Sequence, residues 1–268
     1  MSETSIDIVE RTKEEWSLGA YPNLATVFMP IAAKLVDVAA IGPDDTVLDV
    51  ACGTGNVTLT ASRRGGDVTG VDITPRMLAD ARERAATIDA DVDWQEGDAA
   101  ALHFDDDSFD VTLSCLGHMF VPDADAAGSE LLRVTKPGGT IAYTSWTPDS
   151  GIAAMMRVLG EYVPPEPDPS PPPFLWGDPD TVRDRLGDHV DGIEFETATV
   201  MYPAFSPADF WHAMTTDSGG IMLAVDAVPE TKRAALFEAA IAALDPYFVA
   251  AENAMALEYL LVTATVTE

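Results

Sequence analysis

The pattern of apolar and polar positions divides the first 150 residues into alternating strands and helices. Short apolar, β-branched runs predict buried parallel strands, and apolar residues that recur every three or four positions predict helices. We expect the strands at 47–50, 68–71, 91–95, 109–114 and 140–145, and the helices between them at 57–64, 75–88 and 126–134. Strands that alternate with helices in this way predict an α/β fold with a doubly wound, parallel sheet.

The segments that flank this core have different patterns. At the N-terminal side we expect helices at 8–18 and 23–40, the second ending before Gly42-Pro43. The stretch 164–173 is rich in proline and predicts an extended loop. Beyond it the pattern predicts a short helix, a strand, a helical insertion, a long helix and a last strand, at 179–186, 193–201, 207–225, 229–244 and 257–266.

The turn after the first strand has the features of a nucleoside-binding site. The strand runs into Gly53 and Gly55, which permit a tight turn and the close approach of a ligand, and a helix follows at once. The start of that helix presents unpaired N–H groups and the positive end of its dipole. Seventeen residues after Gly55, the second strand ends in Asp72, where a carboxylate can accept two hydrogen bonds from a ribose diol.

Two details of this turn distinguish between nucleoside cofactors. A dinucleotide fingerprint needs a third glycine, and Thr58 stands at that position. Asp49 lies four residues before Gly53, where a carboxylate would repel a diphosphate but attract an ammonium group. The pattern therefore favours a ligand with a ribose and an amino-acid end, such as S-adenosyl-L-methionine (SAM).

Three motifs resemble those of the class I SAM-dependent methyltransferases, within the group similar to quinone and sterol methyltransferases. They are Asp49-x-Ala51-x-Gly53-x-Gly55 with Asp72, then Gly97-Asp98-Ala99, and the stretch from Leu131 to Gly139. The resemblance is strong over 44–146 and weak elsewhere. It implies a Rossmann-like, seven-stranded, mainly parallel sheet with an antiparallel last strand, N-terminal helices and a lid-like insertion. Within a single domain over 1–268, we expect a helical cover at 1–42, a SAM-binding core at 43–150, a variable acceptor-side insertion at 151–230, and a C-terminal helix and last strand at 231–268.

The resemblance also implies roles for individual residues. Asp98 would accept from the adenine amino group while the Ala99 N–H meets a ring nitrogen, although Asp98 could instead cap a short turn. Met77 would cover the adenine or serve as a core methionine, and Trp16 and Tyr21 would close the pocket or simply pack their helix. The residues expected to line the cofactor site are Asp49, Ala51, Cys52, Gly53, Gly55, Asn56, Asp72, Ile73, Met77, Asp98, Ala99, Ser114, Cys115, Trp16 and Tyr21.

His118, just past the fourth strand, is the candidate general base, because an ordinary imidazole takes up a proton near neutral pH. The alternative is a histidine that is packed in the interior. Cys52 and Cys115 are interpreted as small residues that line the pocket, and Cys115 with His118 supplies too few ligands for a metal. Phe174, Trp176, Trp211 and Met214 predict an apolar acceptor pocket, or else ordinary core packing.

Composition limits the partners and the setting. The 268 residues include 45 acidic and 15 basic ones, for a net charge of −30, which favours adaptation to high salt over an ordinary acidic surface. We do not expect the protein to bind nucleic acid, since its sequence lacks the clusters of Lys and Arg that bind phosphate groups. No apolar run approaches the length of a membrane span, residues 1–10 show no secretory signal, and two cysteines fit a reducing cytoplasm. The oligomeric state stays open, a homo-oligomer included.

The sequence therefore predicts methyl transfer from SAM to a small molecule, with S-adenosyl-L-homocysteine as the product. The acceptor would be apolar or aromatic in part, and its identity and the methylated atom stay open. Ser114-Cys115-Leu116-Gly117 stands where DNA-base methyltransferases carry an Asn/Asp-Pro-Pro-aromatic motif, which favours a small-molecule acceptor. One alternative is a protein that binds SAM or a nucleoside without transfer. Another is an NAD-dependent oxidoreductase, against which Thr58 and Asp49 weigh.

Overall fold

The computed structural model describes residues 3–164 and 171–267. The strands form one mixed sheet in the order β3-β2-β1-β4-β5-β8-β6, and the short strand β7 pairs antiparallel with β8. They are β1 (Thr46–Val50), β2 (Asp67–Asp72), β3 (Asp93–Glu96), β4 (Phe109–Cys115), β5 (Thr135–Trp146), β6 (Val190–Pro203), β7 (Phe248–Val249) and β8 (Ala254–Val266). The expected Rossmann-like, mainly parallel sheet with antiparallel pairing near its end is confirmed.

The chain separates into two compact units. The sheet unit comprises Met29–Ser145, Pro171–Thr197 and Leu260–Glu268. The helical unit comprises Met1–Phe28, Trp146–Ser170 and Ala198–Tyr259.

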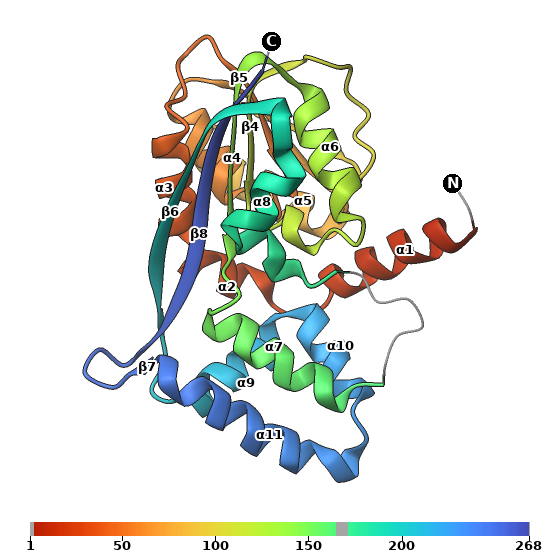
Figure 1. Ribbon diagram of the computed structural model, residues 1–268, viewed down its shortest axis with the longest axis vertical. Helices are drawn as coiled ribbons and strands as arrows, with labels where there is room; N and C mark the ends of the chain where they lie inside the picture. The colour runs from red at the N-terminus through yellow and green to blue at the C-terminus, as the bar shows by residue number, and fades with distance from the viewer. Residues whose placement is uncertain (1–2, 165–170, 268) are drawn as a thin grey trace. The chain divides into compact units, whose positions relative to one another are not determined.

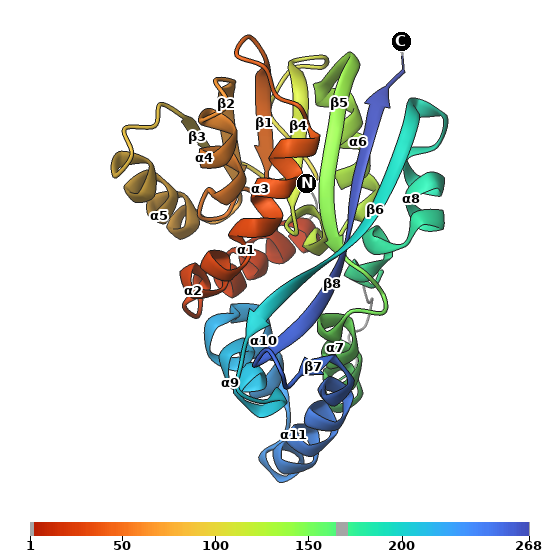
Figure 2. The ribbon, with the colours of Figure 1, turned by 90° about the vertical axis from the view of Figure 1, so that its left-hand side faces the viewer.

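In the sheet unit, five parallel strands lie side by side from β3 to β5 (Figure 2). Helices α3 (Met29–Val38) and α4 (Asn56–Ser62) cover one face, where their side chains form a buried cluster with residues of β1, β2, β4 and β5. Ala142 belongs to that cluster, and because side chains alternate along a strand, its neighbour Tyr143 points to the opposite face. There Tyr143 contacts Trp176, which also lies against Gly128 of helix α6 (Ala124–Val134).

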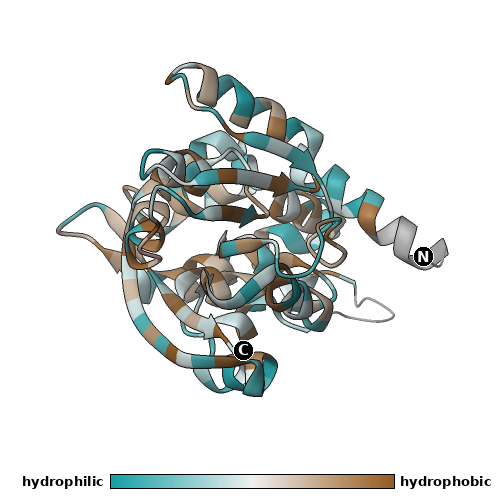
Figure 3. Cartoon of the chain, turned by 90° about the horizontal axis from the view of Figure 1, so that it is seen from above, coloured by the Kyte–Doolittle hydropathy of each residue, from teal (hydrophilic) through white to brown (hydrophobic). Residues whose placement is uncertain are grey.

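The hydropathy of the strands follows their position in the sheet. The β1 residues after Thr46 are all buried, as expected for a strand with helices on both faces, and apolar (brown) residues run through the central strands in Figure 3. In contrast, buried and exposed residues are interspersed along β6, the last strand of the sheet order. The burial expected from the apolar pattern of the first strand is therefore confirmed.

Several helices begin and end close to where the pattern predicts them. They are α4, α5 (Pro75–Ala86), α6, α8 (Pro179–Leu186) and α11 (Glu230–Leu244). The helix expected at 23–40 is wrong as a single element, because α2 (Tyr21–Val27) ends and α3 begins on either side of Phe28. Pro30 explains the interruption, since it has no N–H to continue the hydrogen-bond pattern of the preceding helix.

Two other expected elements differ from the structure. In place of the single helix expected at 207–225, the structure has two helices, α9 (Pro207–Asp217) and α10 (Gly219–Ala227). The extended Ser218 separates them, and the two glycines that follow Ser218 at the start of α10 favour an interruption of the helix. The strand expected at 140–145 begins earlier, at Thr135, so Pro137-Gly138-Gly139 lie inside β5, where the pairing with β4 shifts register between Phe109 and Val111. Gly138 has a φ of +78°, so these residues form an irregularity within a longer strand.

The helical unit contains α1 (Glu3–Ser17), α2, α7 (Gly151–Tyr162), α9, α10 and α11 (Figure 1). Helix α7 packs against α11, and α10 packs against both α9 and α1. The periodicity did not identify α7, which begins at a Ser150 cap whose side chain accepts from the Ala153 N–H. Part of the proline-rich stretch expected to be extended, residues 165–170, lies outside the described residues.

Candidate functional site

The glycine turn joins the end of β1 to the start of α4. Gly53 and Gly55 both have positive φ, +53° and +84°, which glycine adopts without strain. A side chain at Gly55 would also bring its Cβ to 2.7 Å from the Trp94 ring. The Cys52 N–H donates to the Val71 carbonyl at 3.0 Å, which ties the turn to β2. Gly55 is therefore required both by the backbone angle and by the close approach of Trp94.

Asp49 is buried beneath this turn. Its Oδ2 accepts from the Thr58 N–H at 2.9 Å and from the Thr58 hydroxyl, whereas Oδ1 has no partner among the residues that the structure describes. Burial raises the pKa of Asp49 to about 7, and the nearby charge of Asp72 adds to this increase. A cationic group beside Oδ1 would favour the ionised carboxylate. Thr58 stands in place of the third glycine of a dinucleotide fingerprint, and its hydroxyl donates a hydrogen bond to Asp49.

Asp72 connects the glycine turn to the next helix. Its Oδ2 accepts from the Gly53 N–H at 2.8 Å, and its Oδ1 accepts from the Thr74 N–H at 2.8 Å, directly before α5. Burial raises the pKa of Asp72. Each carboxylate oxygen has two lone pairs, so both can accept a further hydrogen bond, as a ribose diol would require.

Arg84 of α5 also holds the turn, and the sequence reasoning missed it. Its Nη1 donates to the Thr54 carbonyl at 2.6 Å and to the Thr54 hydroxyl at 2.9 Å. The guanidinium thus fixes the middle residue of the glycine turn from the last turn of a helix 30 residues further along the chain. No local pattern marks this contact, because only the packing of α5 brings the two residues together.

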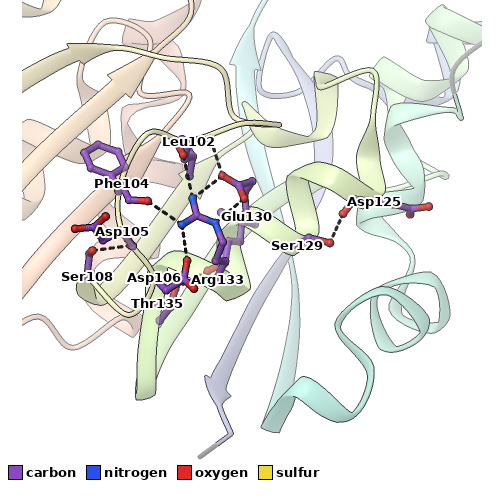
Figure 4. Close-up of polar contacts among 11 residues, drawn as sticks. Leu102, Phe104, Asp105, Asp106, Ser108, Asp125, Ser129, Glu130, Arg133 and Thr135 are labelled. Carbon is purple, nitrogen blue, oxygen red and sulfur yellow. Dashed lines mark hydrogen bonds and ion pairs between the residues drawn. The ribbon is translucent and has the colours of Figure 1, made fainter. Parts of the chain in front are cut away.

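The loop after β3 carries Asp98 and Ala99. The Asp98 Oδ1 accepts from the Ala100 N–H at 2.9 Å, so Asp98 does cap a short turn, as one of its two expected roles required. The loop is held from α6 by Arg133, which donates to the carbonyls of Leu102 at 3.0 Å and Phe104 at 2.8 Å (Figure 4). The adenine contacts expected of Asp98 and Ala99 stay a prediction.

The end of β4 packs directly against the end of β1. The Ser114 hydroxyl donates to the Val50 carbonyl at 2.8 Å and accepts from the His118 N–H at 3.1 Å. Gly117 lies so close to Ala51 that a Cβ on it would be 2.8 Å from the Ala51 carbonyl oxygen. Ala51 and Leu116 both have positive φ, +55° and +58°, and such strain in non-glycine residues gathers at functional sites.

The other residues of the expected site lie near this edge or within its helices. Cys52 and Met77 are buried, Ile73 is half-buried beside Asp72, and Asn56 is the first residue of α4. The Cys115 thiol accepts from the Thr144 hydroxyl at 3.4 Å, and burial raises its pKa to about 12, so it is no nucleophile at neutral pH. Burial also raises the pKa of Cys52.

His118 is fully buried. Its ring lies edge-on to Tyr143 and Trp176, with centroids 4.4 and 4.7 Å away. Burial, with a smaller contribution from the positive charge of Arg185, lowers the pKa of His118 to about 3. The ring is therefore neutral at pH 7 and a weaker base than an exposed histidine, and its catalytic role stays a prediction.

The expected aromatic residues fall into both units. Phe174 and Trp176 belong to the sheet unit, whereas Trp211 and Met214 are buried in α9 of the helical unit. Trp16 and Tyr21 also belong to the helical unit, where their rings meet edge-on with centroids 5.8 Å apart. Their roles in closing a pocket stay predictions.

Within residues 3–164 and 171–267, no three or more His, Cys, Asp and Glu side chains gather as a metal site would require. Over the same residues, none of the helices combines the length and the apolar character needed to cross a bilayer.

Known proteins resemble this chain in sequence and in fold. A family model described as "Methyltransferase domain" matches residues 47–139. An uncharacterized protein of Mycobacterium tuberculosis is 40% identical over 198 residues, which are 74% of this chain and 72% of that protein. A demethylmenaquinone methyltransferase of Thermus thermophilus is 37% identical over 117 residues, 43% of this chain and 53% of the enzyme. The crystal structure of a putative methyltransferase from Bacillus halodurans has a TM-score of 0.60 at 20% identity, covering 88% of this chain and 99% of that one, which shows a shared fold.

Proposed function

The chain belongs to the class I SAM-dependent methyltransferase family, and on this premise we propose that it transfers the methyl group of SAM to a small-molecule acceptor. The observation that carries the proposal is the pair of buried carboxylates at the ends of β1 and β2. Asp49 and Asp72 lie on neighbouring strands, and main-chain N–H groups of Thr58, Gly53 and Thr74 hold them in place. S-adenosyl-L-homocysteine would be the second product.

The polar groups of this edge fit the chemical groups of SAM. Asp72 would accept from the ribose diol, and the unpartnered Oδ1 of Asp49 would favour the ammonium group. The glycine turn would bring a ligand close to the start of α4, where the helix dipole has its positive end. Asp98, Ala99 and Met77 would contact the adenine, as the family resemblance implies.

The chain's own residues would mainly bind and orient the reactants. SAM, when bound, supplies a methyl group that its sulfonium already makes electrophilic. The buried ends of β1 and β4 would keep water from the reacting atoms and hold an acceptor in line. With a pKa of about 3, His118 would serve as a base only for an acceptor that loses its proton readily.

We further propose an acceptor that is aromatic or apolar in part. Support comes from the buried aromatic side chains Phe174 and Trp176 beyond β4, and from the similarity to an enzyme named demethylmenaquinone methyltransferase.

We also propose that the protein works in a cytoplasm of high salt. The charge of −30 would repel itself strongly at low ionic strength, and screening relieves that repulsion. Neither cysteine forms a disulfide, which agrees with a reducing compartment.

The test is calorimetric titration with SAM and with S-adenosyl-L-homocysteine, at 0.1 M and at molar KCl, followed by product analysis with a panel of phenols, quinols and aromatic acids. We expect both nucleosides to bind and at least one acceptor to accelerate the formation of S-adenosyl-L-homocysteine. Binding without turnover on any acceptor would favour a nucleoside-binding protein. If neither nucleoside binds at either salt concentration, or if NAD rather than SAM raises the melting temperature, the proposal fails.

A further inference from the structure

Four residues of the sheet unit form a buried aromatic cluster at the β4–β5 side of the sheet. They are His118 of the short helix η1 (His118–Phe120), Tyr143 of β5, Trp176 of η2 (Pro173–Gly177) and Arg185 of α8. The three rings meet edge-on, with centroids between 4.4 and 5.5 Å apart. The Arg185 guanidinium lies over the Trp176 ring, 4.5 Å from its centroid. We call these four residues the aromatic cluster.

Five polar atoms of the aromatic cluster are buried without hydrogen-bond partners among the described residues. Among the described residues, none hydrogen-bonds to Nδ1 or Nε2 of His118, the hydroxyl of Tyr143, Nε1 of Trp176 or Nη1 of Arg185. Native interiors pair nearly all such atoms, and an unpaired one destabilises the folded chain. Five in one place therefore indicate a site that a ligand completes.

The charge of the aromatic cluster is positive and poorly compensated. The Arg185 side chain is only 12% exposed, and its nearest carboxylate, Asp125, lies 3.9 Å from Nε and is 93% exposed. Solvent screens a pair of this kind, so it offsets little of the charge. Burial lowers the pKa of His118, and the positive charge of Arg185 acts in the same direction.

The donors of the aromatic cluster outnumber its acceptors. Trp176 Nε1 and Arg185 Nη1 can only donate, the Tyr143 hydroxyl can donate, and a neutral imidazole donates from one of its two nitrogens. A water molecule would bring two donors of its own and no charge. An anionic oxygen group accepts from several donors at once and neutralises a guanidinium, most favourably as a carboxylate.

We propose that the aromatic cluster binds a carboxylate, and that this carboxylate belongs to the methyl acceptor. The second part rests on the proposed function. Its support is position: the His118 N–H donates to Ser114, whose hydroxyl donates to Val50 at the end of β1, next to the glycine turn. Ligands of doubly wound sheets bind at the carboxyl ends of the strands, so a carboxylate in the aromatic cluster would lie beside the cofactor edge. The acceptor class is then an aromatic or apolar acid.

The experiment measures carboxylate binding separately from SAM binding. Protein labelled with ¹⁵N-histidine is titrated with benzoate, with acetate and with the neutral analogue benzamide, in chloride-free buffer at constant ionic strength. The His118 ring signals are assigned by their loss in His118→Gln. We expect benzoate and acetate to shift these signals saturably and benzamide to leave them in place. A parallel titration with chloride tests whether a free inorganic anion uses the same site.

Two variants and one control make the test specific. Arg185→Gln should weaken benzoate binding at least tenfold, and Trp176→Phe, which keeps a ring but removes Nε1–H, should weaken it several-fold. The control is Arg183→Gln on the same helix, because Arg183 is 55% exposed and pairs with Asp180 at 2.8 Å. It should bind benzoate as the wild type does. Melting curves and SAM titrations establish that each variant is folded.

The outcomes separate this proposal from the proposed function. Benzoate binding that depends on Arg185 supports the carboxylate site, and faster SAM consumption with an aromatic acid supports its assignment to the acceptor. Unmoved His118 signals with every anion, chloride binding without carboxylate binding, or unchanged benzoate binding in both variants would overturn it. Wild-type protein that binds benzoate through Arg185 but does not bind SAM would support the carboxylate site and refute methyl transfer.

Discussion

Two regions of the sheet unit differ in whether their buried polar groups have hydrogen-bond partners within the chain. At the ends of β1 and β2, Asp49 and Asp72 accept hydrogen bonds from nearby main-chain N–H groups before any ligand arrives. In the aromatic cluster, the polar atoms of His118 and Trp176 are buried without partners among the described residues. In the described part of the chain, the first region is organised by its own backbone and leaves only Asp49 Oδ1 unpaired among the oxygens of its two carboxylates, whereas the second leaves five polar atoms for a ligand to pair.

The difference has an energetic consequence. A carboxylate held by N–H groups is already oriented, so a ligand gains affinity without the cost of ordering the site. Unpaired donors instead cost stability in the free protein and return that free energy when a partner binds. Substitutions should therefore destabilise the first region and be tolerated by the second.

The largest expected effect is the loss of stability when Asp49 loses the hydrogen bond from the Thr58 hydroxyl. Thr58→Gly restores the three-glycine fingerprint but removes the hydroxyl that donates to Asp49. Together with the cost of glycine within a helix, we expect the free energy of unfolding to fall by about 3 kcal/mol. Urea denaturation measures it. Thr58→Ser, which keeps the hydroxyl, should lose much less, and an equal loss in both variants would contradict the explanation.

The next effect concerns ligand binding in the same region. Asp72→Asn keeps the shape of the side chain but weakens its acceptance from the Gly53 N–H and from a ribose diol. We expect SAM affinity to fall about 10- to 100-fold, which corresponds to the roughly 1.4–2.8 kcal/mol of a charged hydrogen bond. Calorimetry measures the change, and Arg185→Gln is the control from the second region. If Asp72→Asn binds SAM with unchanged affinity, Asp72 does not bind the ribose diol.

A third test uses the pH dependence of Asp49. Because burial raises its pKa to about 7, the folded protein holds a proton there that SAM's ammonium group would have to displace. The ionised fraction grows as pH rises from 6 to 7.5, so SAM should bind several-fold more tightly at the higher pH. Asp49→Asn should bind SAM more weakly and show a smaller change over this range. If SAM affinity changes equally with pH in the wild type and in Asp49→Asn, Asp49 does not face the ammonium group.

The smallest effect on stability is expected in the second region. His118→Phe keeps an aromatic edge against Tyr143 and Trp176 and removes two unpaired nitrogens. We expect the free energy of unfolding to stay the same or to rise by up to about 1 kcal/mol, with SAM affinity unchanged. A loss of more than about 1 kcal/mol would show that the imidazole has partners in the free protein. Turnover of the same variant tests the base role, which predicts a slower reaction.

Much of the fold could be predicted because the signals are local. The buried run before Gly53 predicted β1, and Thr74-Pro75 predicted the start of α5. The errors arose where one residue overrode a continuous pattern: Phe28 and Pro30 divide a helix, and Ser218 divides another. Apolar periodicity continues across such breaks, because it reflects which face is buried rather than whether the backbone hydrogen bonds continue.

The candidate site divides in the same manner. Asp49, Gly53, Gly55 and Asp72 could be named in advance, because a tight turn and an acidic strand end are encoded within a short stretch of chain. Arg84 could not, since its contact with Thr54 depends on how α5 packs. His118 was identified as a candidate base, but its environment comes from distant segments that lower its pKa to about 3.

The sequence by itself determined the alternating strands and helices of β1 to β5, the glycine turn and its two carboxylates, since each follows from backbone preferences and apolar patterning within a few residues. Only the tertiary structure decided that Tyr143, Trp176 and Arg185 surround His118, because these residues come from three separate elements. Burial and nearby charge set the basicity of a side chain, and both depend on neighbours that the chain supplies only after it has folded.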